Sequence, residues 1–223
     1  MPRHARVAVA DTIYHVINRA NGRVPIFNVD KAYEHFESLL HEAKELTGMR
    51  ILAYCIMPNH FHFILYPRTD TNLSEFMRWL TTTHVRQYRA VTETIGYGHL
   101  YQDRYKSFPV ETNAYALTLV RYVEQNPLRA KLVQRAEQWR WSSLWRREKG
   151  TPMQRKLLHT LPIELPRNYL ESVNTILSKD DLTSIRQSVN KGKPYGTVPW
   201  VESTIDRFGL MFTQRGPGRP HQH

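Results

Sequence analysis

Apolar and polar residues alternate along short stretches in the first half of the chain, a pattern that predicts β-strands. These stretches span residues 12–19, 49–56, 60–66 and 104–110. Met57-Pro58-Asn59 predicts a tight turn, so the second and third strands should form a hairpin. Pro109 has no amide proton to donate and favours an edge position for the last strand.

Three segments between and after these strands carry apolar residues at helical spacing. They span residues 31–46, 74–91 and 114–125. The candidate N-caps are Asp30 for the first helix, Asn72 or Ser74 for the second, and Thr112 or Asn113 for the third; Gly48 and Asn126-Pro127 are the expected stops. The order β-α-β-β-α-β-α predicts an α+β protein: a ferredoxin-like antiparallel sheet of four to five strands with helices on one face.

The periodicity weakens after Trp139, which predicts a change in organisation. Residues 150–168 contain three prolines and are expected to form a linker and packing loop. Short helices are expected at about 168–190 and 199–208. We therefore divide the chain into a main domain, 1–148, and a small helical C-terminal extension, 149–223, that ends in a flexible basic tail.

The formal net charge is +11 and the isoelectric point is about 9.9, which favours a polyanionic partner such as nucleic acid over a merely soluble basic surface. Residues 26–85 hold five Lys and Arg against seven Asp and Glu, whereas residues 86–149 hold twelve against six. The basic surface should therefore come from the middle of the chain. The outer face of helix 31–46 is acidic and should lie away from nucleic acid; it carries Glu34, Glu37, Glu42 and Glu45.

Several classes of protein are disfavoured. Cys55 is the one cysteine, which rules out an intramolecular disulfide and a cysteine-based zinc site. The sequence contains no run of about 18 apolar residues, which a membrane-spanning helix would need, and its N-terminal stretch lacks the apolar region of a signal peptide. We expect a cytoplasmic protein, associated with the nucleoid if its partner is DNA.

Two histidines lie inside the apolar stretch PNHFHFIL. In a strand, His60 and His62 point to one face of the sheet, while Phe61, Phe63 and Leu65 point to the other. Two neighbouring imidazoles can chelate one divalent metal ion. The alternative is a pair of ordinary core or edge histidines.

The phase of helix 114–125 offers a second set of chemical groups. Its core stripe consists of Ala116, Leu119, Val120 and Val123. Tyr115, Tyr122 and Asn126 cluster on the flank beside that stripe. If the helix packs beside the two histidines, it could present a phenol and a carboxamide to the same metal ion. The alternative is that Tyr122 is a half-buried helix tyrosine and Asn126 a helix stop.

These groups suit attack on a phosphodiester. A phenol is a weak nucleophile at its usual pKa of about 10, and the attack also needs charge neutralised on the phosphate. A divalent cation held by two imidazoles and a neutral oxygen would polarise the phosphate and keep coordination positions open, which suits Mg²⁺ or Mn²⁺. Basic residues expected to hold the DNA backbone are Arg104, Lys106, Arg121, Arg129 and Lys131.

Two motifs resemble those of a known family. PNHFHFIL resembles the HUH motif, and RYVEQNPLRAKLV resembles the catalytic-helix signature of REP-associated tyrosine transposases. Similar stretches are TIYHVINRANGR, WRWSSLW and SVNKGKPYGTVPWVESTIDRFGL followed by RGPGRP, so the resemblance spans most of the chain.

The resemblance implies a ferredoxin-like HUH single-tyrosine nuclease in residues 1–148. Such an enzyme acts on single-stranded DNA at palindromic REP hairpins beside a short recognition tetranucleotide, and works as a monomer. By position, Tyr122 corresponds to the nucleophile that forms a 5′-phosphotyrosine. His60 and His62 correspond to the metal ligands, and Asn126 corresponds to the residue that completes the metal site. Helix phase makes Gln125 the second choice for that last ligand.

Two other features have alternative interpretations. The terminal stretch with Arg215 and Arg219 is similar to an AT-hook core, or is a disordered basic tail. The group Trp139, Trp141 and Trp145 favours core packing over stacking on DNA bases.

Two further functions compete with the nuclease. One is a non-catalytic nucleic-acid-binding protein that recognises repeat hairpins. The other is a metal-dependent hydrolase of small phosphodiesters, which would need neither the +11 charge nor a positioned tyrosine.

Overall fold

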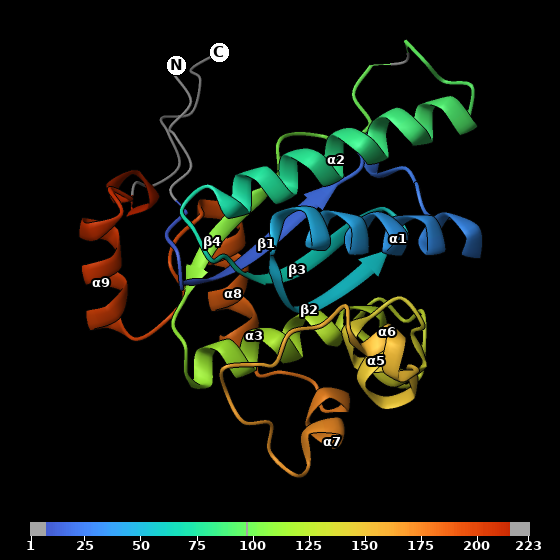
Figure 1. Ribbon diagram of the computed structural model, residues 1–223. Coiled ribbons are helices and arrows are strands. Elements are labelled where there is room, and N and C mark those ends of the chain that lie inside the picture. The colour runs from blue at the N-terminus through green and yellow to red at the C-terminus, as the bar shows by residue number, and fades with distance from the viewer. Residues whose placement is uncertain (1–7, 97, 215–223) are drawn as a thin grey trace, which may run out of the picture.

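The computed structural model describes residues 8–96 and 98–214 and centres on an antiparallel sheet (Figure 1). The strands are β1 (Ile13–Arg19), β2 (Arg50–Met57), β3 (His60–Tyr66) and β4 (Lys106–Val110), in the spatial order β2-β3-β1-β4. Each predicted strand is present within two residues of its expected bounds. β4 is the edge strand beside β1, as Pro109 indicated.

The helices α1 (Asp30–Thr47) and α2 (Asn72–Val91) pack together on one face of the sheet. The buried cluster there is rich in aromatic residues, including Phe36, Phe61 and Phe63. α1 ends at Gly48, whose φ of 68° is in the left-handed region that glycine adopts without strain. The connection β1-α1-β2-β3-α2-β4 and the strand order confirm the predicted α+β, ferredoxin-like fold.

Helices also cover the opposite face of the sheet, so the expectation of helices on a single face is wrong. α3 (Ala114–Glu124) and α8 (Lys179–Lys191) pack there in a second buried cluster (Figure 1). The strands carry apolar side chains on this face too, including Leu52 and Ile64. A sheet with two apolar faces needs a cover on each, because exposed apolar surface is unfavourable in water.

The chain continues as a second short helix directly after α3 ends. Gln125 is the C-cap of α3, and α4 (Asn126–Arg129) starts at once, with Pro127 in its first turn where a missing amide proton costs little. Asn113 caps α3, its Oδ1 accepting a hydrogen bond from Tyr115 N at 2.8 Å. The caps expected for the other two helices are wrong by one residue or more, since Val29 and Thr71 hold those positions.

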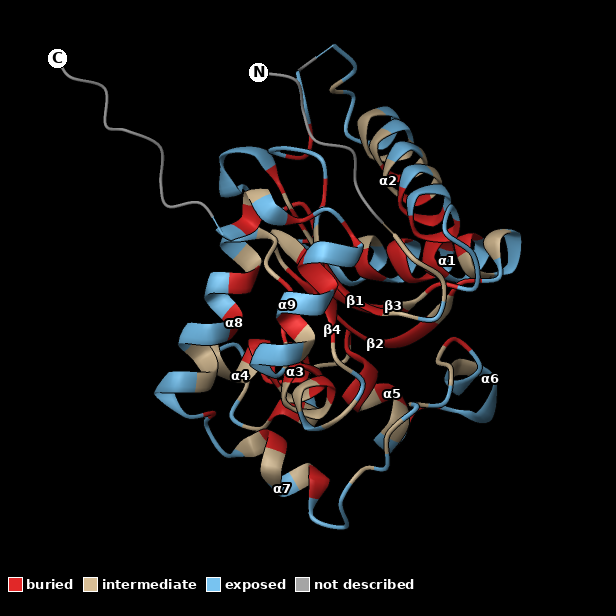
Figure 2. Cartoon of the chain, turned by 90° about the vertical axis from the view of Figure 1, so that its left-hand side faces the viewer, coloured by how far each residue is buried: buried red, intermediate tan, exposed pale blue. Residues whose placement is uncertain are grey.

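The remaining elements are short. They are η1 (Asn21–Arg23), η2 (Ala136–Gln138), α5 (Ser143–Lys149), α6 (Pro152–Arg155), α7 (Tyr169–Asn174), α9 (Val198–Arg207) and η3 (Met211–Gln214). The extension packs against α3, as Tyr169, Val173 and Ile185 share its buried cluster. Figure 2 shows the strands buried at the centre, with the outer turns of α2 and α8 exposed. Within the described ranges, no helix is long and apolar enough to cross a membrane.

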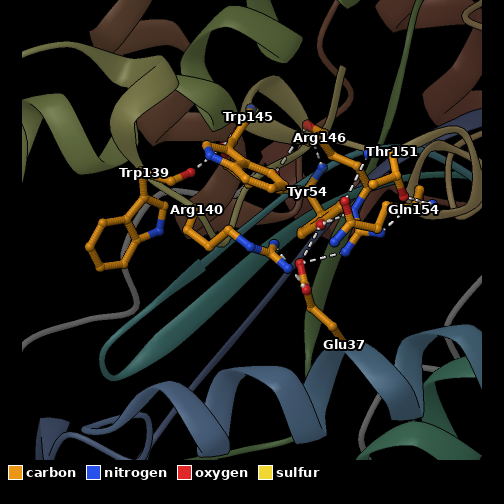
Figure 3. Close-up of polar contacts among 10 residues, drawn as sticks. Glu37, Tyr54, Trp139, Arg140, Trp145, Arg146, Thr151 and Gln154 are labelled. Atoms are coloured by element: carbon orange, nitrogen blue, oxygen red, sulfur yellow. Dashed lines mark hydrogen bonds and ion pairs between the residues drawn. The ribbon is translucent and has the colours of Figure 1, made fainter. Parts of the chain in front are cut away.

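Glu37 does not belong to the acidic outer face of α1; that assignment is wrong. The residue is buried under α5, and Figure 3 shows its carboxylate in a polar network. Tyr54 donates its hydroxyl proton to Glu37 Oε1 at 2.6 Å, and Arg146 approaches the same oxygen at 2.8 Å. Arg140 contacts Glu37 Oε2 at 3.2 Å. The network joins α1, β2 and α5, so this carboxylate holds tertiary structure together.

The tryptophan group packs within the fold. Trp141 is buried and stacks on Tyr33, with ring centroids 4.8 Å apart. Trp139 donates its indole proton to Ile56 O at 2.9 Å. The Arg140 guanidinium lies 4.1 Å from the centre of the half-buried Trp145 ring (Figure 3). These contacts favour packing over a stacking surface for DNA bases.

Candidate active site

β3 places both histidines of the H-x-H motif on the face of the sheet that α3 covers. Their ring centroids lie 5.1 Å apart, while Phe61 and Phe63 point into the opposite cluster. His62 is buried and His60 is half-buried. The alternation expected from the sequence therefore matches the arrangement of these side chains.

Each imidazole uses its Nδ1 atom for a contact inside the protein. His60 Nδ1 lies 2.6 Å from Asn59 Oδ1, and His62 Nδ1 lies 2.9 Å from Nε2 of His15. Burial lowers the pKa of His60 to about 4, with a smaller effect from Arg19. Burial also lowers the pKa of His62 well below 6.5. Both rings are thus neutral at neutral pH, the protonation state in which an imidazole nitrogen can ligate a metal ion.

The end of α3 brings a phenol and a carboxamide to the same place. The ring centroid of Tyr122 lies 5.9 Å from that of His62. The Asn126 amide nitrogen donates to Tyr122 O at 2.9 Å and to Val123 O at 3.2 Å. Its amide protons are therefore directed to backbone carbonyls, and Oδ1 is the polar atom left to face a ligand.

These four residues line one pocket of about 400 Å³. The wall residues come from β1, β2, β3, α3, α4 and α8, and α8 lies beside α4 in Figure 2. The polar residues of the wall are Arg19, His60, His62, Tyr122, Asn126, Arg129, Arg186 and Asn190. The C-terminal extension thus contributes to the pocket through α8.

Three arginines make the pocket positive. The guanidinium carbon of Arg129 lies 4.6 Å from the Tyr122 ring centre. Arg129 Nη1 and Arg19 Nε are buried without a hydrogen-bond partner. Buried donors of this kind suit an anionic ligand, because a phosphate oxygen would satisfy them. Arg186 of α8 completes the set.

Arg129 was expected from the sequence, whereas Arg19 and Arg186 were not. The sequence held a signal for Arg19, because its two-residue spacing from Ile17 and His15 places all three side chains on one face of a strand. In the structure, Arg19 pairs with His60 of the neighbouring strand. Arg186 had no such signal, because it lies in the exposed part of a helix more than 50 residues after Tyr122.

The other basic residues expected to contact DNA are dispersed. Arg104 lines a separate groove of about 840 Å³ between α2 and residues 98–105. Lys106 and Lys131 are exposed. Arg121 donates to Ser172 O at 2.8 and 3.2 Å and so holds the extension against α3. Arg215 and Arg219 lie outside the described residues.

Gln125, the second choice for a metal ligand, is turned away from the pocket. Its Nε2 donates to Val173 O and Thr175 O, both at 2.7 Å, and the side chain is fully buried. The neighbouring Glu124 is also buried and faces α5 and α7. Both side chains therefore join α3 to the second half of the chain.

The donors in the pocket fit a divalent cation of intermediate hardness. Two neutral imidazoles and one amide oxygen form a mixed nitrogen and oxygen set that leaves coordination positions open. In the part of the chain that the structure describes, no group of three or more His, Cys, Asp and Glu is placed to hold a metal ion. A metal site here would thus depend on the carboxamide of Asn126 as well as on the histidines.

Comparison with known families decides the classification. The family model described as IS200-like transposase matches residues 8–126, more than half of the chain. The chain belongs to this family. The transposase resemblance drawn from the motifs is therefore confirmed, and the family is one of DNA-processing enzymes. The matched region contains both histidines and Tyr122, and ends at Asn126.

One solved structure shares the fold of this chain. A REP-associated tyrosine transposase bound to a REP hairpin superposes with a TM-score of 0.54 at 19% sequence identity, covering 69% of this chain and 90% of that one. A putative transposase from Deinococcus radiodurans R1 gives a TM-score of 0.39 at 20% identity, over 55% of this chain and 96% of that one. No match is found among curated proteins.

Proposed function

We propose that this transposase is a metal-dependent single-stranded DNA endonuclease and strand transferase. It would act on palindromic, REP-type hairpin DNA through a covalent 5′-phosphotyrosine intermediate. One observation carries the proposal: His60, His62, Tyr122 and Asn126 line the same pocket, together with arginines that have unsatisfied donors. Pure binding of DNA would give no reason for this combination.

Tyr122 is the proposed nucleophile. Its phenolic oxygen attacks the phosphorus of the scissile phosphodiester and loses its proton. The bond from phosphorus to the 3′-oxygen breaks, and that oxygen gains a proton to leave as a 3′-OH. The 5′ end stays on the tyrosine, and a 3′-OH can later attack it to rejoin strands, because the phosphodiester is exchanged and not hydrolysed.

His60, His62 and Asn126 would hold Mg²⁺ or Mn²⁺, which when bound polarises the phosphate as a Lewis acid. Arg19 and Arg129 would bind phosphate oxygens through their buried, unpaired donors. Arg129 also brings positive charge beside the Tyr122 ring, where negative charge develops during attack.

Charge and fold support a DNA hairpin as substrate. The net charge of +11 favours a polyanion, and the fold matches that of a protein whose structure contains a REP hairpin. Lys106 and Lys131 are exposed and stay in the proposed DNA-contact set, whereas Arg121 donates to Ser172 O and does not. The proposed form of the enzyme is a monomer that acts at the nucleoid in the cytoplasm.

A covalent adduct tests this proposal. The protein would be incubated with Mn²⁺ and a labelled hairpin that carries single-stranded flanks, taken from inverted repeats beside its gene. A denaturing gel should show a protein–DNA band that EDTA prevents and Tyr122→Phe removes. Tyr115→Phe is the matched control, because Tyr115 lies on the same helix and packs on Tyr195 at 5.0 Å.

Two other results would overturn the proposal. Hairpin binding that EDTA does not affect, with no adduct under any metal, would indicate a non-catalytic binding protein. Turnover of small phosphodiesters that survives Tyr122→Phe would indicate a metal-dependent hydrolase.

A further inference from the structure

We propose that His15 is a positioning residue for the metal site. It accepts a hydrogen bond from His62 Nδ1 and so holds His62 in the tautomer whose Nε2 lone pair can ligate a metal ion. The inference rests on the proposed function, because the tautomer of His62 matters only if His62 binds a metal ion. It concerns a residue of β1 that is not itself a proposed metal ligand and whose ring lies edge-on to that of Tyr122, with centroids 6.4 Å apart.

The sheet and its neighbours hold His15 in place. It is fully buried on β1, two residue pairs along the ladder from His62, and its ring is stacked on the His62 ring at 5.1 Å. Phe108 of β4 packs against its side at 4.9 Å. His15 Nε2 lies 2.9 Å from His62 Nδ1. With neighbours on both sides, the ring has little freedom to turn this contact away.

Two proton arrangements are possible across this contact. A neutral imidazole carries one proton, so either His62 Nδ1 donates or His15 Nε2 donates. If His15 donates, the His62 proton must sit on Nε2, and that nitrogen cannot bind a metal. If His62 donates, its Nε2 keeps a lone pair. A functional metal site therefore needs His15 as the acceptor.

His60, the other histidine of the motif, has a hydrogen-bond partner that can act only as an acceptor. His60 Nδ1 lies 2.6 Å from Asn59 Oδ1, and an amide oxygen can only accept. The Asn59 amide nitrogen donates to Arg23 O at 2.9 Å, which fixes the orientation of the carboxamide. His60 is thus held with its proton on Nδ1, and His15 gives His62 the equivalent arrangement.

The remaining nitrogen of His15 is a second clue. His15 Nδ1 is buried and has no hydrogen-bond partner. A core position filled for packing alone would favour an apolar residue, because an unpaired polar atom is unfavourable in a core. The imidazole at this position is explained by the acceptor that its Nε2 offers to His62.

Two substitutions separate this role from packing. His15→Leu removes the acceptor and keeps an apolar side chain, whereas His15→Gln places an amide oxygen near the Nε2 position. Isothermal titration with Mn²⁺ alone should show that His15→Leu weakens binding about 10- to 100-fold, while His15→Gln stays within about threefold of the wild type. Thermal unfolding followed by circular dichroism would confirm that both variants are folded.

A matched control lies in α2, which packs on the opposite face of the sheet. His84 is also a buried histidine, and its Nδ1 lies 2.7 Å from the Tyr101 hydroxyl. His84→Leu should lower the melting temperature as His15→Leu does and leave Mn²⁺ affinity unchanged. Equal loss of affinity in His15→Leu and His15→Gln, or no loss in either, would overturn the positioning role.

Nitrogen NMR of the metal-free protein tests the tautomer directly. Long-range ¹H–¹⁵N correlations should place the His62 proton on Nδ1 in the wild type and shift it toward Nε2 in His15→Leu. A wild-type His62 protonated on Nε2 would overturn the proposal. Absence of Mn²⁺ binding by wild type would instead defeat the proposed function, and the NMR result would still decide the role of His15.

Discussion

The junction between α3 and α4 presents two pairs of polar residues to two different regions. Tyr122 and Asn126 face the pocket, where they meet the histidines of β3. Glu124 and Gln125, between them in sequence, face the C-terminal extension. We call the second region the clamp, defined by Glu124, Gln125 and the groups that they contact.

The two regions differ in how far their polar atoms are satisfied. Glu124 accepts hydrogen bonds from Ser143 Oγ at 2.5 Å and from Tyr169 at 2.6 Å, and also pairs with Arg147. In the pocket, by contrast, Arg19 Nε and Arg129 Nη1 are buried and unpaired. Each such atom costs about 1–3 kcal/mol.

This difference separates structure from function along one helix end. The polar groups of the clamp are hydrogen-bonded to other parts of the chain, so substitutions there should change stability. The pocket retains unsatisfied donors that a ligand can complete, and so it should govern activity. The clamp also holds the helix at the place where Tyr122 meets His62.

The largest expected effect is on stability, at the clamp. Glu124→Ala should lower the free energy of unfolding by about 3–5 kcal/mol, because it leaves Arg147 without its partner in a largely buried position. Urea unfolding followed by circular dichroism measures the change. Glu171→Ala is the control, since Glu171 pairs with Arg135 at the surface and should cost less than about 1 kcal/mol. Equal losses in the two variants would remove the distinction between clamp and surface.

The next effect is on activity, at the pocket. His60→Ala should slow formation of the covalent adduct about 100-fold or more, because loss of the proposed metal ligand would remove several kcal/mol of transition-state stabilisation. The free energy of unfolding should change by less than about 1 kcal/mol, since His60 is half-buried. Initial rates of adduct formation are the measurement, with His159→Ala as the control. A rate within a fewfold of wild type would exclude His60 as a ligand.

Adjacent residues give the sharpest form of the comparison. Gln125→Ala should lower the free energy of unfolding by about 1–3 kcal/mol, because the carbonyls of Val173 and Thr175 lose their donor, and Mn²⁺ affinity should not change. Asn126→Ala should weaken Mn²⁺ binding about 10-fold or more. Titration calorimetry and urea unfolding on both variants measure the two quantities. The reverse pattern would make Gln125 the ligand.

The smallest effect concerns acid and the buried histidines. Burial lowers the pKa of His84 to about 3, against about 6.5 in an unfolded chain. Between these values the unfolded chain binds more protons than the folded one. The free energy of unfolding should therefore fall as pH drops below about 6.5, by up to about 1.4 kcal/mol per pH unit for each such histidine.

His84→Gln removes one of these groups from the aromatic face of the sheet, away from the pocket. Urea unfolding between about pH 7 and pH 5 should give a shallower loss of stability in this variant than in wild type. His41→Gln, at an exposed position, is the control variant. Identical slopes in all three proteins would show that folding does not lower the pKa of His84.

Much of the fold followed from local patterns. Strand alternation located all four strands, and the two-residue period placed His60 and His62 on one face. Helix phase grouped Tyr122 with Asn126, and both line the pocket. These inferences succeeded because they depend on the geometry of one strand or one helix, which the sequence specifies directly.

Other features could not be predicted from the sequence, because they depend on contacts between elements that are far apart in the chain. Glu37 was assigned to an exposed acidic face, yet the Tyr54 hydroxyl and the Arg146 guanidinium draw it into the core. Gln125 was a possible ligand on helix phase, and the carbonyls of Val173 and Thr175 occupy it instead. In each case the partner lies at least 17 residues away.

By itself, then, the amino-acid sequence determined the four strands and the first three helices of this transposase, their order, and which strand side chains share a face. The tertiary structure alone decided which faces meet: α3 on the histidine face of the sheet, Arg186 in the wall of the pocket, and His15 against His62. The reason is physical. Periodicity is set by backbone geometry within one element, whereas the meeting of two elements is set by packing and hydrogen bonding summed over the whole chain.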